Sequence, residues 1–234
     1  MLISGIQKFT MLDFPDKTAC VVFTPGCNFR CGYCHNSEFV LPELIEKIKH
    51  NFIPEEVFFN FLRQRVGKLD GVVISGGEPT LMADLPAFIQ KVKNFGFAVK
   101  LDTNGNNPEM LEKITSRSLV DYIAMDVKTC LDKYQELAGE LASIRNIKKS
   151  IELIQKSGIP YEFRSTLVKE IHPPAVLERM ARLLNGSNVI YLQQFRPLHT
   201  LDPEFENYHA FSKEEMEGIA DMFKKYAGEA EIRI

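Results

Sequence analysis

The chain has 234 residues, of which 45% are hydrophobic and 25% are charged, and its formal net charge is −3 at pH 7. This composition is typical of a globular protein and argues against disorder, and the small negative charge argues against a nucleic-acid partner, which usually binds a basic surface. The sequence also lacks an apolar run of the ~20 residues that a membrane helix needs and the pattern of a signal peptide, so we expect a cytoplasmic protein without a membrane partner.

Short apolar runs that end at Gly, Pro or Asn alternate with helical segments along the chain. Six of these runs are predicted to be strands, beginning near Thr18, Gly71, Ala98, Val120, Tyr161 and Val189. The predicted helices begin at Pro54 or span residues 85–95, 109–116, 144–157, 175–184 and 213–226. Strands that alternate with helices of this length indicate βαβ units and a parallel sheet.

Six strands are fewer than the eight that close a TIM barrel. We therefore expect an α/β fold with a partial (β/α)6 TIM-like barrel of mainly parallel strands. Residues 1–16 are predicted to form an N-terminal edge segment, 17–200 the (β/α)6 core, and 201–234 a C-terminal helix with a short end strand over 231–234. The sequence has no linker, repeat or low-complexity tract, so we interpret residues 1–234 as one domain. Chemistry in such sheets lies beyond the carboxyl ends of the strands.

Three of the five cysteines follow the first of these six strands within eight residues, as Cys27, Cys31 and Cys34. The spacing C-x3-C-x2-C lets three thiolates converge on one centre, and sulfur ligands favour an iron–sulfur cluster, zinc or Cu(I). Structural zinc needs a fourth ligand. His35 is poorly placed to supply it, and Cys20 and Cys130 form no second pair, so we interpret both of these as buried apolar residues. The trio is therefore predicted to leave a coordination position open.

The cysteine motif, with Tyr33 before its last cysteine, resembles the signature of the radical S-adenosylmethionine (SAM) superfamily. Residues Tyr33-Cys34-His35-Asn36 resemble, more specifically, the activases of glycyl radical enzymes, and the resemblance extends from about Gly5 to Arg196. It implies that the three cysteines hold a [4Fe–4S] cluster and act catalytically through it. It also implies that SAM binds to the open iron, with Tyr33 and His35 beside it.

A pair of glycines and a glutamate follow the second predicted strand, at Gly76, Gly77 and Glu78. Glycines let the backbone come close to a ligand, and a carboxylate can accept a hydrogen bond from an ammonium group. Taken alone, the same residues also fit a turn before a helix. After a cluster loop they resemble the superfamily's GGE motif, which implies that they contact the amino group of SAM.

The third predicted strand ends in Asp102-Thr103-Asn104-Gly105. Asn-Gly is typical of a tight β-hairpin. A helix rather than a return strand is predicted after it, so we interpret this segment as a strand-end loop. It resembles the D-T-N-G segment of the activases. That resemblance implies that Asp102 lies near SAM and that Asp102 and Thr103 lie near a monovalent cation.

Charged residues also end the later strands. Asp126 and Lys128 lie two apart and can face the same side, as in an ordinary strand-end ion pair. The resemblance implies that Asp126 helps to bind the cation and that Lys128 contacts SAM. Arg164 matches a family arginine that would suit a carboxylate, although a solvated strand residue is an equal alternative. Arg196 lies near the place of a histidine in pyruvate formate-lyase activating enzymes and is our last candidate for a SAM contact.

The resemblance implies a radical SAM oxidoreductase that cleaves SAM reductively and generates a glycyl radical on a partner enzyme under anaerobic conditions. Anaerobic ribonucleoside-triphosphate reductase is the favoured partner, with a flavodoxin- or ferredoxin-type electron donor. The alternatives are an activase of pyruvate formate-lyase or of another glycyl radical enzyme, and a small-molecule radical SAM enzyme such as 7-carboxy-7-deazaguanine synthase. A zinc or iron–sulfur module for binding or electron transfer is the non-enzymatic alternative. We interpret His172 and His199, on loops after the last two predicted core strands, as surface residues.

Overall fold

The computed structural model describes residues 1–234 and contains one sheet of eight strands, in which each strand pairs with its neighbour in the chain. The strands are β1 (Gly5–Thr10), β2 (Ala19–Thr24), β3 (Gly71–Gly76), β4 (Ala98–Thr103), β5 (Tyr122–Asp126), β6 (Tyr161–Leu167), β7 (Val189–Gln194) and β8 (Glu229–Arg233). Only β1 runs antiparallel to its neighbour. The α/β fold class and the six predicted core strands, β2 to β7, are confirmed.

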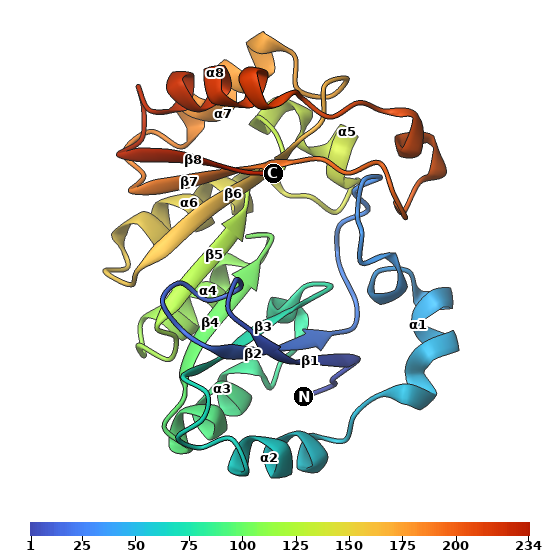
Figure 1. The fold of residues 1–234 in the computed structure, drawn as a ribbon, viewed down its shortest axis with the longest axis vertical. Helices are drawn as coiled ribbons and strands as arrows, with labels where there is room; N and C mark the ends of the chain where they lie inside the picture. Colours follow the sequence, from blue (N-terminus) through green and yellow to red (C-terminus); the bar gives the residue numbers. More distant parts are fainter.

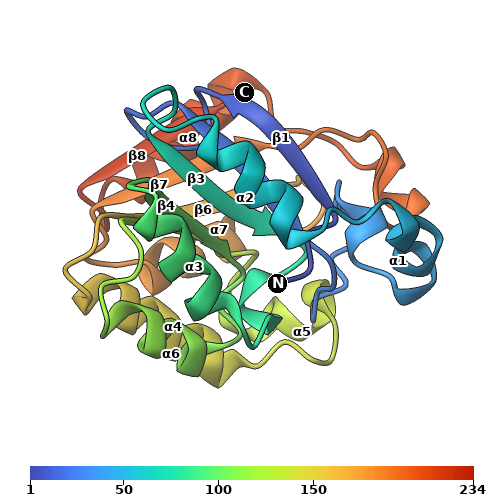
Figure 2. The same ribbon diagram turned by 90° about the horizontal axis from the view of Figure 1, so that it is seen from below.

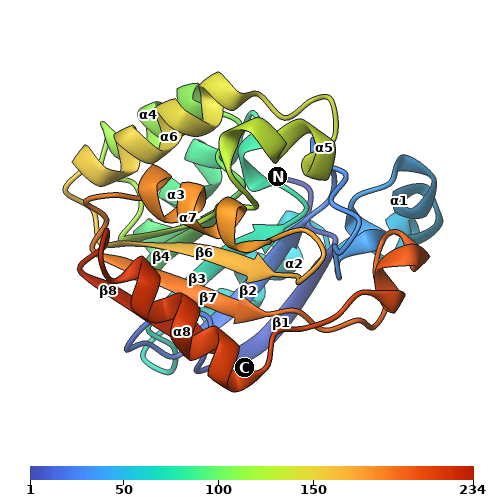
Figure 3. The same ribbon diagram turned by 90° about the horizontal axis from the view of Figure 1, so that it is seen from above.

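The sheet curves from β1 to β8 into an incomplete barrel, with helices on its convex side (Figure 1). The helices are α1 (Pro42–Ile48), α2 (Glu55–Arg63), α3 (Leu85–Asn94), α4 (Pro108–Thr115), α5 (Tyr134–Ala138), α6 (Ile144–Lys156), α7 (Pro174–Leu183) and α8 (Lys213–Phe223). Figure 2 shows α2, α3, α4 and α6 following one another along the outside of the sheet, and Figure 3 shows α7 and α8 over β6 to β8. None of these helices combines the length and the apolar character that crossing a bilayer requires.

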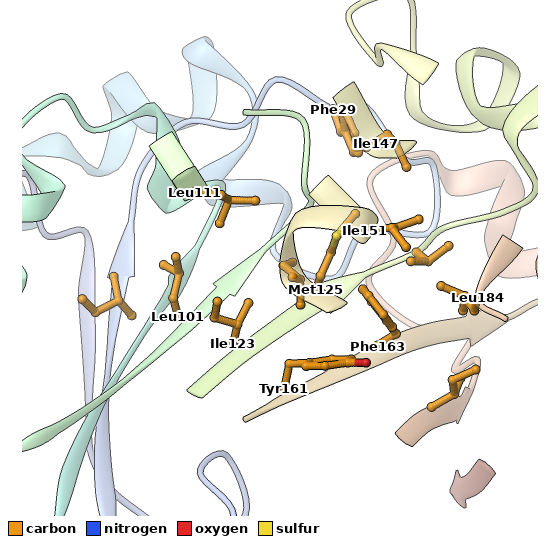
Figure 4. Close-up of a cluster of buried hydrophobic side chains, with 14 of the residues drawn as sticks. Phe29, Leu101, Leu111, Ile123, Met125, Ile147, Ile151, Tyr161, Phe163 and Leu184 are labelled. Atoms are coloured by element: carbon orange, nitrogen blue, oxygen red, sulfur yellow. The ribbon is translucent and has the colours of Figure 1, made fainter. Parts of the chain in front are cut away.

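The core lies between the convex side of the sheet and these helices. Leu101, Ile123 and Phe163, from three neighbouring strands, are fully buried beside Ile147 and Ile151 of α6 (Figure 4). In α6 these two isoleucines lie four residues apart, so they share one face of the helix. Alternate residues of a strand point to opposite sides. The neighbours of the buried strand residues therefore face the concave side of the sheet.

Strand register brings the predicted motifs to one end of the sheet. Thr24 at the end of β2 pairs with Gly76, and Asp126 at the end of β5 pairs with Arg164. Two short helices that the sequence did not predict, α1 and α5, also lie in loops at this end. The last strand, β8, begins two residues before the predicted end strand. The parallel arrangement thus gathers loops that are far apart in sequence around one concave space.

Candidate functional site

A cavity of about 330 Å³ opens at the carboxyl ends of the parallel strands. Thirteen of the fourteen sequence-predicted site residues line it: Cys27, Cys31, Tyr33, Cys34, His35, Gly76, Gly77, Glu78, Asp102, Thr103, Asp126, Lys128 and Arg164. They come from the last residues of β3, β4 and β5, from the loops after β2, β3 and β5, and from β6. The structure therefore brings the separate motifs into one site.

The cysteine loop is held on two sides. The backbone N–H of Arg30 donates to the carbonyl of Ala138 at the end of α5 (2.8 Å), and the N–H of Asp202 donates to the carbonyl of Gly32 (2.9 Å). The guanidinium of Arg30 also donates to the carbonyl of Cys27 (2.6 Å). Because these bonds satisfy the backbone of an irregular loop, the loop can present its thiols in a fixed arrangement.

The donor set of the loop fits an iron–sulfur cluster. Cys27, Cys31 and Cys34 line the same cavity, yet no three His, Cys, Asp or Glu side chains gather closely enough to hold one metal ion. A cluster binds each thiolate through a different iron and so needs its ligands apart. The sulfur of Cys27 accepts from the N–H of Phe29 (3.3 Å) and from Asn104 Nδ2 (3.8 Å), and such bonds to sulfur are a usual feature of cluster sites.

The thiols of this loop are neutral unless a metal binds them. Burial raises the pKa of Cys27 to about 11 and that of Cys31 to about 12, and it raises the pKa of Cys34 as well. Coordination deprotonates a thiol, so cluster binding would release protons here. The hydroxyl of Tyr33 is buried without a hydrogen-bond partner beside the cysteines, as expected for a group that a ligand would satisfy.

The paired glycines allow two loops to touch. Gly76 has φ +123°, and a Cβ there would lie 2.2 Å from the backbone nitrogen of Thr24. A Cβ on Gly77 would lie 2.1 Å from the carbonyl oxygen of Gly26. Only glycine fits this approach without moving the backbone. The residue types of the motif are therefore required for the cysteine loop and the β3 loop to pack together.

Glu78 is buried, and four hydrogen bonds from the chain itself engage its carboxylate. One oxygen accepts from Thr80, through both its N–H and its hydroxyl, and from the hydroxyl of Thr103 (2.7 Å). The other oxygen accepts from the N–H of Asn104 (2.6 Å). A carboxylate offers about four acceptor positions. In this arrangement, Glu78 joins the loops after β3 and β4 and keeps one acceptor position on its second oxygen, and burial raises its pKa.

Charged side chains of alternating sign gather on the concave side of the sheet, where all of them but the buried Lys100 line the cavity. Arg164 lies between two carboxylates, with Nε 2.8 Å from Asp126 and a terminal nitrogen 3.4 Å from Asp102. Asp102 also pairs with Lys100 (2.7 Å), and Asp126 pairs with Lys128 (3.0 Å). Burial opposes ionisation of Asp126, but Arg164 and Lys128 outweigh it and hold the pKa of that carboxyl well below its usual value. We call these five residues the charged network.

The structure separates the last predicted residue from the others. The side chain of Arg196 is exposed and does not line the cavity, and its backbone carbonyl accepts from Nε2 of His35 (2.9 Å). Gln193 and Thr166 line the cavity instead. Thr166 lies in β6 and Gln193 in β7, whereas Arg196 follows the end of β7. Because side chains alternate along a strand, Gln193 points to the side opposite the buried Leu192, and this pattern could have favoured Gln193 as a site residue.

The prediction of a surface histidine at position 172 is wrong. His172 is fully buried, and its Nδ1 accepts from the N–H of Val168 (3.0 Å). Its Nε2 donates to the carbonyl of Lys128 (2.9 Å). The imidazole is therefore neutral, burial lowers its pKa, and the ring ties the loop after β6 to the loop that carries Lys128.

Comparison with known proteins assigns a family to this arrangement. Residues 21–184 match the family model described as the radical SAM superfamily. A Methanocaldococcus jannaschii protein described as a candidate glycyl-radical enzyme activating enzyme is 36% identical over 99% of this chain and 95% of its own length. The pyruvate formate-lyase-activating enzyme of Streptococcus mutans is 30% identical over 86% of this chain and 78% of its own. A domain of the Bacteroides vulgatus pyruvate-formate lyase-activating enzyme matches 70% of this chain and 99% of its own, with a TM-score of 0.55 and 18% identity.

Proposed function

The chain belongs to the radical SAM superfamily, as an oxidoreductase of the glycyl-radical-activating type, and from that premise we propose that its partner is an anaerobic ribonucleoside-triphosphate reductase. Membership of the superfamily implies a [4Fe–4S] cluster and SAM as cofactors. When bound, the cluster supplies one electron for the cleavage of SAM, and the radical so formed removes a hydrogen atom from a glycine of the partner. The single observation that supports the radical SAM chemistry of this chain is the cavity that the three thiols share with Asp102, Asp126, Lys128 and Arg164.

The cysteine loop would hold the cluster through Cys27, Cys31 and Cys34, which line the cavity. The charged network offers a site for the carboxylate of SAM. Its three cations, Lys100, Lys128 and Arg164, face two carboxylates, those of Asp102 and Asp126, so one positive charge is left to pair with an anionic group. Glu78 keeps one acceptor position on the oxygen that binds Asn104, and with the backbone of Gly76 and Gly77, which also line the cavity, it offers a site for the ammonium group.

Two further aromatic groups complete the proposed SAM site. Tyr33 places its unpartnered hydroxyl beside the cysteines, and His35 lines the cavity while its Nε2 donates to the carbonyl of Arg196.

Exclusion of water is the other contribution that the chain makes, because a reactive radical must be kept from solvent. Phe205, in the 3-10 helix Pro203–Asn207, packs on Gly32 and lies 6.2 Å from the ring of Tyr33, which covers this side of the loop.

The monovalent cation stays a prediction. It would bind near Asp102, Thr103 and Asp126, whose two carboxylates already pair with Arg164. The flavodoxin- or ferredoxin-type electron donor and the cytoplasmic location are proposals of the same kind. Support for the reductase as the partner comes from sequence alone, in the segments beginning at Gly5 and Gln193 that resemble the reductase branch of the activases.

The decisive experiment is anaerobic reconstitution with iron and sulfide, followed by incubation with SAM, a reductant and purified anaerobic ribonucleotide reductase. The expected result is a visible cluster absorbance, cleavage of SAM and a glycyl radical doublet in the electron paramagnetic resonance spectrum of the reductase. A reductase whose radical-bearing glycine is replaced by alanine is the control and should give no doublet.

The same experiment separates the alternatives. A doublet on pyruvate formate-lyase but not on the reductase would show that the partner is wrong. SAM cleavage without a radical on either enzyme would favour a small-molecule substrate. A protein that binds zinc, or a cluster that never cleaves SAM, would overturn the enzymatic proposal itself.

A further inference from the structure

A second buried carboxylate lies directly behind the charged network. Glu162 and Arg164 are two residues apart in β6, so both face the concave side of the sheet. Arg164 lines the cavity, whereas Glu162 is only 1% exposed and lies deeper in the barrel. A buried carboxylate is costly unless cations or hydrogen-bond donors satisfy it. The partners of Glu162 therefore matter for Arg164, two residues further along β6.

The main partner of Glu162 comes from the last strand of the sheet. Two guanidinium nitrogens of Arg233 in β8 lie 3.2 and 3.4 Å from the two carboxylate oxygens of Glu162, and the hydroxyl of Tyr122 donates to it at 3.3 Å. The guanidinium also lies over the ring of Tyr191, 3.5 Å from its centroid. Arg164 contacts the same carboxylate only at 3.9 Å. Arg233 is thus well placed to neutralise Glu162.

The balance of charge at the cavity depends on this pair. With Glu162 neutralised by Arg233, the charged network keeps three cations against two carboxylates, and Arg164 stays between Asp102 and Asp126. Without Arg233, Glu162 would have Arg164 as its nearest cation. Attraction between charges is strong where water is excluded, so Arg164 would move toward Glu162. Its 3.4 Å contact with Asp102 is the weaker of its two contacts in the network and would be lost first.

We propose that Arg233 is a positioning residue for SAM binding, which neutralises Glu162 and thereby leaves Arg164 available at the cavity. The inference rests on the proposed function only in taking SAM as the ligand of the cavity. Arg233 itself touches neither the cavity nor any proposed cofactor contact except through Glu162. Its role is to keep a neighbouring carboxylate from competing for Arg164.

The test is SAM binding, measured by equilibrium dialysis on the reconstituted, oxidised enzyme without reductant, so that no turnover occurs. Arg233→Met is expected to raise the Kd for SAM about tenfold, a size typical of coupled charges in one network. The double variant Glu162→Gln/Arg233→Met removes the competing charge and is expected to return the Kd to within about threefold of the wild type. Arg233→Lys keeps the charge, and its Kd for SAM should lie between those of Arg233→Met and the double variant.

The matched control is Arg182→Met. Arg182 is an exposed arginine of α7 that pairs with Glu178 (2.6 Å) outside the cavity, and its loss should leave the Kd unchanged. Cluster content and thermal unfolding are measured for every variant. A merely structural role of Arg233 would lower thermal stability without the recovery of affinity that the double variant should show.

Two results would overturn the inference. One is an Arg233→Met protein that binds SAM as the wild type does, and the other is a double variant as weak as the single one. If Arg233→Met does not fold, Arg233→Lys takes its place in the comparison. A double variant that binds SAM as weakly as Arg233→Lys would then overturn the inference. A wild-type protein that binds SAM but forms no glycyl radical on the reductase overturns the proposed partner and does not affect the inference about Arg233. A wild-type protein that binds no SAM overturns both.

Discussion

Neighbouring residues of β6 lie in two different environments. Phe163 and Leu167 are fully buried on the helix side of the sheet, among other apolar side chains. Glu162, Arg164 and Thr166 face the cavity side, where Arg164 alone contacts three carboxylates. Strand β4 follows the same rule, with Leu101 on the helix side and Lys100 on the cavity side.

The two sides differ in what a substitution should cost. On the helix side, burial is non-directional and scales with apolar area, so a smaller side chain loses stability in proportion to the cavity that it leaves. On the cavity side, each charged side chain contacts one of opposite sign, so removing one group leaves its partner without that contact. We therefore expect helix-side substitutions to change the stability of the fold and cavity-side substitutions to change ligand binding.

A pair of buried cysteines provides the largest expected contrast. Cys31 faces the cavity, whereas Cys20 lies within β2 in the apolar core. Cys31→Ala removes one of three proposed cluster ligands and is expected to lower SAM cleavage by more than about a thousandfold, since a coordination site needs each of its ligands. Iron content and cluster absorbance after anaerobic reconstitution measure the loss.

Cys20→Ala is the matched control. It should keep the full iron content and cost about 1 kcal/mol of unfolding free energy, as expected when a small buried side chain is shortened. If Cys20→Ala lost the cluster as well, the division between the two sides of the sheet would be wrong.

Phe163 tests the helix side on its own. Phe163→Ala leaves a void beside α6 and is expected to cost about 3–5 kcal/mol of unfolding free energy, measured by urea denaturation. The folded protein should still bind SAM with nearly the wild-type Kd at low temperature, because the cavity side of β6 is unchanged. A large loss of affinity in the folded variant would show that the two sides are coupled through the strand.

His172 gives the smallest effect and contrasts a neutral buried group with the charged network. Burial lowers its pKa, so the folded protein does not take up the proton that the unfolded chain binds near pH 6.5. The contribution of the neutral His172 to the unfolding free energy is complete above about pH 6.5 and is lost as the pH falls below that value. Between about pH 7.5 and about pH 5.5, the wild type should lose about 1 kcal/mol more than His172→Asn. Equal losses in the two proteins would contradict a neutral His172.

The strands could be predicted because each one depends on a short run of apolar residues that are adjacent in the sequence. β3 begins at Gly71 and ends at Gly76, and its apolar run between them gives the strand without knowledge of its neighbours. The site motifs were predictable for the same reason, as was their meeting at the carboxyl ends of the strands. Helix α5 was missed because it is only five residues long and has no side-chain cap at its start.

What could not be predicted depends on partners far away in the sequence. Glu162 is buried because register brings it to Tyr122 and Arg233, 40 and 71 residues away. Lys100 is fully buried, although lysine rarely is, because register places it between Val73 of β3 and Tyr122 of β5. His172 has the sequence context of an exposed loop residue, but it is buried, and its Nε2 donates to the carbonyl of Lys128, 44 residues away.

The order of the strands has a consequence for how the chain folds. Because every strand pairs only with the strands just before and after it in the sequence, each pairing closes a loop of limited length and carries a similar cost in chain entropy. The sheet can therefore grow one strand at a time as the chain emerges during synthesis. The charge balance at the cavity would then be completed last, when β8 brings Arg233 to Glu162.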